Sequence, residues 1–173
     1  MVRDGLQRFL STGYSTAAPR HGAMTVVDSS PVRRTSLTPE QITIVQTTIG
    51  ALGPDALDEL AIDFYDRLFA ADASIAALFT ADPARLRRKF VDELAVIVGA
   101  IRRLDDFVGA GDALGRRHRD YGVRASHYRV AGEVLLDALA AALGPAWTPE
   151  TAAAWQLAYH LIVAAMTCSA GGV

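Results

Sequence analysis

The stretch LGRRHRDYGVRASHYRVAGEVLL (residues 114–136) decides the fold, because it combines the end of one predicted helix with the start of another. His118 stands among three arginines and an aspartate, with Leu114 one helical turn before it and Tyr121 just under one turn after it. Residues three or four apart share a helix face, so these three side chains are predicted to lie on one side. We expect Gly122 to end this helix and the arginines to be solvated on its back.

Outward from this stretch, apolar residues recur at spacings of three and four, the period of an amphipathic helix. Pro39, Pro83 and Pro149 each follow a Thr or an Asp, a pairing typical of helix starts. Ser126 is expected to cap the helix that Gly144 stops. No segment alternates like a strand, so we predict an all-α fold of six or seven helices. The predicted helices are residues 39–49, 55–69, 83–101, a shorter one around His118, 126–143 and 149–167.

Composition narrows the class of protein. The formal net charge is −2, which gives no support to nucleic-acid binding. Cys168 is the only cysteine, so an internal disulfide and a cysteine-based metal site are excluded, and a cytoplasmic location is expected. No apolar run approaches the roughly 18 residues of a membrane span. Residues 1–36 are rich in Ser, Thr, Arg, Gly and Pro, which predicts a flexible N-terminal extension before one domain over 37–173.

The histidines carry the candidate chemistry. None of His21, His118, His127 and His160 forms the i, i+4 pair that holds zinc on a helix, and no phosphate-binding or nucleophile motif is present. A lone histidine on an amphipathic helix is more often a packed or surface residue than a ligand. The sharper alternative is an axial ligand, because haem iron in a helical pocket needs only one protein histidine. We interpret His127 and His160 as structural.

Five segments together resemble a globin. They are FYDRLF (64–69), LF (78–79), RRKF (87–90), the opening stretch and AAWQLAY (153–159). In order and spacing, residues 37–167 are similar to bacterial single-domain globins, to the globin half of flavohaemoglobins and to the haemoglobins of methane-oxidising bacteria. The resemblance implies a globin fold around haem b, with a globin domain over 37–173.

The resemblance also implies roles for particular residues. His118 matches the proximal histidine, the fifth ligand of the iron, with Leu114 on the same face. Phe79 matches the phenylalanine that packs on the haem, although it would be a core residue in any helical fold. Tyr65 matches the distal tyrosine that donates a hydrogen bond to bound oxygen, although an ordinary buried tyrosine is the alternative. Tyr128 matches a tyrosine that bonds near the proximal imidazole and tunes it.

On the distal helix, the chain departs from the pattern that the resemblance implies. Leu86 falls where these globins commonly have glutamine, and Phe90 falls where they usually have leucine. In this register Tyr65 is the only distal hydrogen-bond donor; a slip of one residue places Arg85 or Arg87 there instead. Lys89 is a candidate partner of a haem propionate, with a solvated lysine as the alternative.

The end of the chain also departs from flavohaemoglobins. No acidic residue follows Glu150, although flavohaemoglobins have a glutamate near the end of the last helix. The chain leaves no room for a reductase domain, so any turnover is expected to need an external reductase. We therefore expect reversible binding of O₂, NO and CO. The alternatives are a nitric oxide dioxygenase and, less favoured, a haem-free globin-fold sensor or scaffold.

Overall fold

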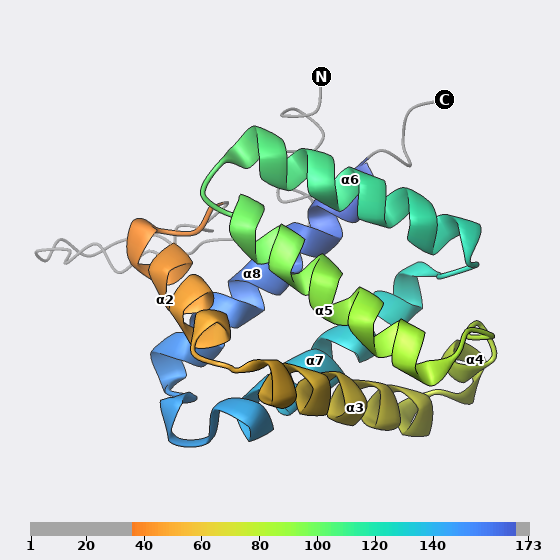
Figure 1. The fold of residues 1–173 in the computed structure, drawn as a ribbon. Coiled ribbons are helices and arrows are strands. Elements are labelled where there is room, and N and C mark those ends of the chain that lie inside the picture. The colour runs from red at the N-terminus through yellow and green to blue at the C-terminus, as the bar shows by residue number, and fades with distance from the viewer. Residues whose placement is uncertain (1–35, 169–173) are drawn as a thin grey trace, which may run out of the picture.

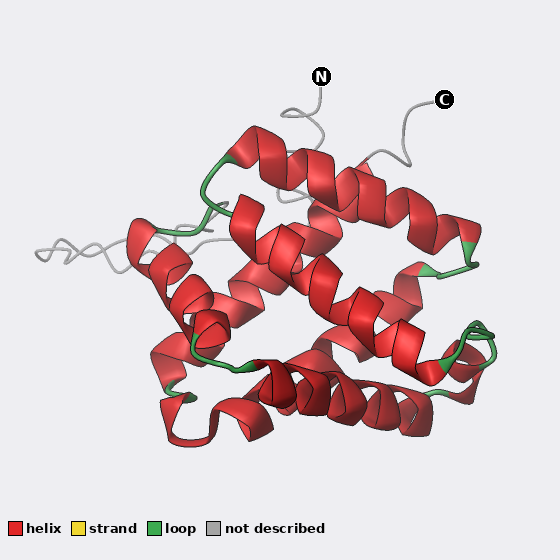
Figure 2. Cartoon of the chain, in the orientation of Figure 1, coloured by secondary structure: helices red, strands yellow, loops and turns green. Residues whose placement is uncertain are grey.

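The computed structural model describes residues 36–168, which form a bundle of helices (Figure 1). All regular structure in this range is helical, with no strand (Figure 2), which confirms the predicted all-α fold. Residues 1–35 and 169–173 lie outside the described residues, so the flexible extension over 1–36 stays a prediction. The elements are α2 (Pro39–Gly50), α3 (Pro54–Ala71), α4 (Ala73–Ala76), α5 (Pro83–Ala100), α6 (Leu104–Asp120), α7 (Ala125–Leu143), the 3₁₀ turn η1 (Gly144–Ala146) and α8 (Pro149–Cys168).

Three helix starts form as the sequence predicts. The Thr38 hydroxyl accepts from the Gln41 N–H (3.3 Å), and the Gln41 side-chain oxygen accepts from the Thr38 N–H (3.0 Å). The Asp82 carboxylate accepts from the Arg85 N–H at the start of α5 (3.0 Å). Thr148 caps α8 in the same way. Each cap satisfies a backbone donor that the first helical turn leaves without an intrahelical partner.

The start of α7 differs from the prediction. The helix begins at Ala125 with Arg124 as its N-cap, so Ser126 is not the cap. Instead, the Arg124 N–H donates to Nδ1 of His127 (3.2 Å). His127 lies three residues after the N-cap, a position from which a side chain can reach back to the N-cap amide. The imidazole therefore accepts from the N-cap amide, the reciprocal half of a capping box, and does not replace the bond to a first-turn amide that a capping serine would accept.

The predicted helix around His118 is α6, which has 17 residues against 18 in α5 and includes three interior glycines. Glycine lowers helix propensity, but two of these glycines have a packing reason. A Cβ added at Gly111 would meet Ala165, and one at Gly115 would meet backbone atoms of Met166. The close approach of α6 to α8 thus requires glycine at both positions.

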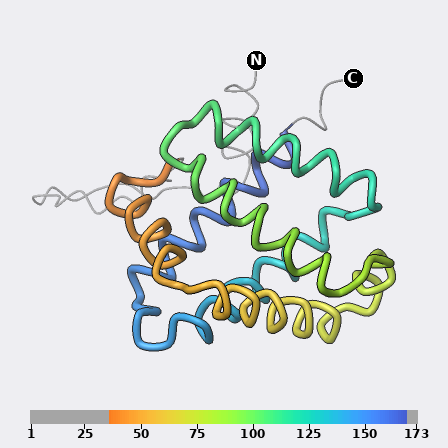
Figure 3. The backbone as a smooth tube through the Cα atoms, in the orientation of Figure 1, coloured from red at the N-terminus to blue at the C-terminus, as the bar shows by residue number. Residues whose placement is uncertain are grey.

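Contacts between helices connect α3, α5, α6, α7 and α8. α6 packs against α8 and α5, whereas α3 packs against α7 and α5. α5 therefore contacts both α3 and α6 (Figure 1). The chain trace shows the start of α2 beside the turn that joins α5 to α6 (Figure 3). From this turn, Arg102 Nε donates to Oε1 of Gln46, further along α2 (2.7 Å).

Beneath these contacts lies one hydrophobic core. Its most completely buried large side chains are Val45, Leu60, Leu139 and Trp155, which come from α2, α3, α7 and α8. The indole N–H of Trp155 donates to the Thr48 hydroxyl (3.0 Å), so the one polar group of this side chain is satisfied. Within residues 36–168, no helix has the length and apolar character needed to cross a membrane.

Candidate functional site

His118 lies in the last turn of α6, half-buried, with a defined tautomer. Its Nδ1 lies 2.9 Å from the Leu114 carbonyl oxygen, and because a carbonyl only accepts, Nδ1 carries the proton. In the neutral ring, Nε2 is then unprotonated, and no other group in the described residues bonds to it. Burial lowers the pKa of His118, and the neighbouring charge of Arg117 acts in the same direction. The site therefore favours a neutral imidazole with a free lone pair on Nε2.

Tyr128 of α7 lies beside this imidazole. The two ring centres are 6.2 Å apart and the planes differ by 24°, so the rings lie nearly parallel. Within residues 36–168 the Tyr128 hydroxyl makes no hydrogen bond to His118. The Tyr128 carbonyl accepts from the Tyr159 hydroxyl of α8 (2.5 Å), which fixes the start of α7 against the last helix.

Two of the arginines around His118 are not merely solvated, which corrects the expectation for this face. Arg116 is exposed and pairs with Asp112 of its own helix. Arg117, by contrast, pairs with Glu93 of α5, and Arg119 donates to the Met166 carbonyl of α8 (3.0 Å). These two contacts connect the end of α6 to α5 and to α8.

Tyr65 of α3 lies in a cluster of aromatic rings. Its ring centre is within 5.1–5.8 Å of the centres of Phe64, Phe69, Phe79 and Phe90. Burial raises the pKa of its hydroxyl to about 12. That hydroxyl has no hydrogen-bond partner among the described residues. The hydroxyl is only partly desolvated, so water can still reach it, and it is free to donate to a ligand that enters from outside.

Phe90 and Leu86 lie on the inner face of α5. Phe90 stacks on Phe64 with ring centres 4.7 Å apart, so this face of α5 points toward α3. Leu86, one turn earlier, is half-buried. Arg85 is exposed, and Arg87 pairs with Asp58 of α3 (3.2 Å).

Lys89 is on the exposed side of the same helix. Its ammonium donates to the Tyr121 hydroxyl (3.1 Å) and lies 5.3 Å from the centre of that ring. Tyr121 caps the end of α6 and is 54% exposed, although the sequence placed it on the face of His118. This contact bridges α5 and α6 at the protein surface.

The remaining described histidines do not join this site. His127 is buried at the start of α7, and its Nδ1 accepts from the Arg124 N–H. His160 is exposed on α8. His21 lies outside the described residues.

Sequence reasoning missed the tight seam between α6 and α8. Gly111 and Gly115 are four residues apart, and small residues at this spacing are the signal that could have revealed it. No comparable signal marks the bond from Arg119 to Met166, because it depends on where α8 ends in space.

Chemically, the candidate residues offer a free imidazole nitrogen at His118 and an unpartnered hydroxyl at Tyr65. A neutral imidazole with a free Nε2 is a donor for a transition metal. Within residues 36–168, no three His, Cys, Asp or Glu side chains are grouped to hold a metal. A metal bound at His118 must therefore bring its other ligands with it, as the iron of a porphyrin does. The donor set fits such a group.

The fold and the site together define an all-helical protein in which a half-buried histidine, His118, has a free Nε2. The globin family model matches residues 62–166, more than half of the chain. The chain belongs to the globin family. Membership implies haem binding and gas binding of the globin type, and it confirms the globin fold that the segments around His118 predicted.

Curated relatives include both bacterial and vertebrate proteins. The chain is 28% identical over 124 residues to a flavohemoprotein of Bacillus subtilis, which covers 70% of this chain and 31% of that protein. It is 31% identical over 126 residues to the flavohemoprotein of Deinococcus radiodurans, covering 71% and 31%. It is 32% identical over 120 residues to neuroglobin of Danio rerio, covering 61% and 76%. The chain thus spans 31% of the length of either flavohemoprotein.

Proposed function

We propose that this chain binds haem b through Nε2 of His118 and reversibly binds O₂, with NO and CO as alternative ligands. The observation that carries the proposal is the hydrogen bond from Nδ1 of His118 to the Leu114 carbonyl. It fixes the tautomer that leaves Nε2 free, and second-shell bonds of this kind orient histidine ligands to metals. Haem, when bound, supplies an iron with a coordination position at which a diatomic gas binds.

The protein's own contribution is to orient, exclude water and donate one hydrogen bond. Leu114, Phe79, Leu86 and Phe90 are proposed as the apolar contacts that keep water from the bound group. Tyr65 is proposed as the residue that donates to the gas. Its support is the unpartnered hydroxyl within the ring cluster, whose raised pKa of about 12 keeps the proton in place at neutral pH. A hydrogen bond to a polarised ligand contributes about 1–3 kcal/mol, enough to set affinity.

Two further residues are assigned to the edges of the site. We propose Lys89 as the partner of a haem propionate, a role in which its exposed ammonium would exchange the Tyr121 hydroxyl for a carboxylate. Tyr128 is proposed to tune the imidazole of His118 through its nearly parallel ring.

The test is an absorption spectrum of the purified protein, ferric and dithionite-reduced, with and without CO, beside His118→Ala. A strong Soret band that shifts with CO, and that is lost or depends on added imidazole in His118→Ala, is the expected result. His160→Ala is the matched control, because it removes an exposed histidine from α8 and should leave the spectrum unchanged. A protein that stays colourless after haem reconstitution contradicts the proposal.

A nitric oxide dioxygenase that uses an external reductase is the second candidate, favoured by the similarity to two flavohemoproteins. The overall reaction is NO + O₂ + e⁻ → NO₃⁻, with the electron from the reductase. The candidate requires nitrate formation that keeps pace with NO loss when a reductase is added, and a large decrease in Tyr65→Phe. Oxygen binding without catalytic nitrate formation leaves the binding function alone.

A further inference from the structure

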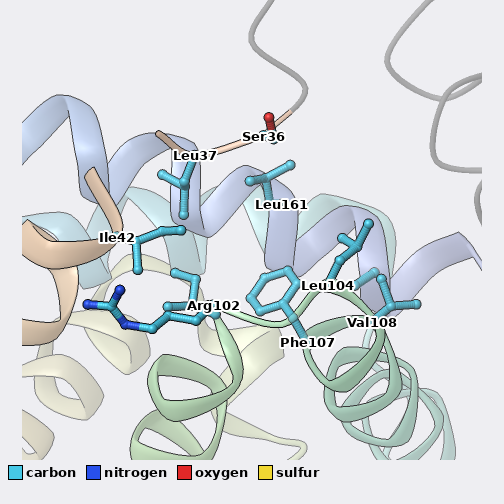
Figure 4. Close-up of a pocket in the computed structure, with 10 residues that line it drawn as sticks. Ser36, Leu37, Ile42, Arg102, Leu104, Phe107, Val108 and Leu161 are labelled. Carbon is cyan, nitrogen blue, oxygen red and sulfur yellow. The ribbon is translucent and has the colours of Figure 1, made fainter. Parts of the chain in front are cut away.

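An apolar groove of about 180 Å³ lies where the start of α2, the turn between α5 and α6, and α8 come together. Figure 4 shows the side chains of Leu37, Ile42, Leu104, Phe107 and Leu161 gathered around it. Leu104 is 47% exposed although it is a large hydrophobic residue at the start of α6. A groove of this composition loses water favourably when another apolar group covers it.

The chain itself leads to this groove. Ser36 and Leu37 are lining residues, and they are also the first two described residues. The segment that precedes Ser36 therefore starts at the rim. An extended chain spans about 3.3–3.6 Å per residue, so Val27, nine residues upstream, can reach any part of the groove. A tethered segment also has an effective concentration of about a millimolar, which an external partner must exceed.

The charges at the two ends of the groove differ, because the lining Arg102 donates to Gln46 Oε1 on the α2 side, whereas two acidic residues follow Leu104 on the α6 side. Leu104 is followed by Asp105 and Asp106, both exposed. Arg103 pairs with Asp106, whereas Asp105 makes no ion pair within residues 36–168. Immediately upstream of the groove the sequence reads VRRTS (32–36), which places two consecutive arginines within a few residues of the rim.

We propose that residues 26–34 lie across this groove, with Val26, Val27 and Val32 against its apolar wall. Arg33 and Arg34 then lie beside Asp105, where opposite charges favour one register. An extended segment needs no helical period, so the irregular sequence of residues 1–36 is compatible with this docking. The proposal concerns the end of the molecule near Leu37 and does not depend on haem.

Disulfide trapping in the full chain tests the proposal. In a Cys168→Ser background, Val27→Cys is combined with Leu104→Cys, and the rate of intramolecular disulfide formation is measured at low salt by intact mass. Val27→Cys with Val96→Cys is the matched control, because Val96 is an exposed aliphatic residue of α5 (55%) outside the groove. We expect the Leu104 pair to form at least tenfold faster.

Charge reversal then tests the register. Arg33→Glu with Arg34→Glu should slow the Leu104 pair about fivefold, and adding Asp105→Arg should restore the rate. Rates for Leu104 and Val96 that agree within twofold describe an undocked tether and overturn the proposal. Disulfides found only between two chains assign the groove to a second copy and overturn it as well.

A second measurement leaves the described residues untouched. Val26→Ser with Val27→Ser removes the apolar side chains that would cover the groove, and binding of the dye anilinonaphthalene sulfonate reports the exposed surface. Dye fluorescence should rise several-fold relative to the parent chain, while Leu6→Ser with Leu10→Ser should leave it unchanged. Equal fluorescence in the parent and in Val26→Ser with Val27→Ser overturns the proposal.

Discussion

On the His118 side of the candidate site, α6 approaches α8 so closely that Gly111 and Gly115 have no room for a Cβ, whereas on the Tyr65 side aromatic rings fill the space. On the His118 side, the position of α6 is determined by its close backbone contact with α8 and by the hydrogen bond from Arg119 to the Met166 carbonyl. The Tyr65 side is set by rings from α3, α5 and the turn after α4.

This difference shows what each side can tolerate. Backbone atoms cannot move without shifting a whole helix, so the seam between α6 and α8 fixes where His118 lies. Rings can rotate and repack at modest cost, provided that the total volume is kept. Under the proposed function, a rigid His118 side would hold the haem firmly and an adaptable Tyr65 side would admit small molecules to it.

The largest effect is expected from truncating the ring cluster. Phe64 is 8% exposed and stacks on Phe90, so Phe64→Ala should lower the free energy of unfolding by about 3–5 kcal/mol through lost burial and a cavity. Phe64→Leu, which keeps most of the volume, should cost less than about 1.5 kcal/mol. Urea unfolding of both variants measures this. Equal losses from the two would show that the cluster is as rigid as the opposite seam.

Enlarging a side chain at the seam between α6 and α8 should have the next largest effect on stability. Gly115→Ala places a methyl group against the Met166 backbone, and overpacking of this kind costs about 1–3 kcal/mol. Gly109→Ala is the matched control: this interior glycine of α6 has nothing within 4 Å of an added Cβ, so the gain in helix propensity should stabilise by about 0.5–1 kcal/mol. Thermal unfolding of the two variants should shift in opposite directions. Shifts of the same sign would contradict the close approach.

These two sides also mark how far the sequence could predict the molecule. Local signals sufficed for the helix starts, because Thr38 and Asp82 act within one turn of the chain. The spacing of Leu86 and Phe90 predicted an apolar face of α5, and Phe90 stacks on Phe64 of α3. The close packing at Gly115 could not be predicted, because its partner, Met166, lies 51 residues further on. Arg117 and Arg119 were expected to be solvated for the same reason, since their partners lie on other helices.

A smaller and opposite effect is expected at Tyr65. Its hydroxyl is partly desolvated and has no partner among the described residues, so Tyr65→Phe should leave the free energy of unfolding of the haem-free protein unchanged or raise it by up to about 1 kcal/mol, while weakening oxygen affinity. Urea unfolding and oxygen titration of the same variant measure both. Tyr159→Phe is the control, because that hydroxyl donates to the Tyr128 carbonyl and its loss should destabilise. A destabilised Tyr65→Phe would mean that the hydroxyl is already satisfied.

The smallest signal concerns the titration of the same hydroxyl, one of five tyrosines in the chain. Burial disfavours the tyrosinate and raises the pKa of Tyr65 from 10.0 to about 12. The folded state therefore keeps this proton while the unfolded state releases it, so the stabilisation present below pH 10 is lost as the pH rises through about 12. The difference in tyrosinate absorbance between the parent and Tyr65→Phe should consequently appear only above pH ~11, with far-UV circular dichroism confirming the folded state at each point. A difference that titrates near pH 10 would instead show that the Tyr65 hydroxyl is fully hydrated. Tyr65 would then be in no more apolar surroundings than a surface ring such as Tyr121.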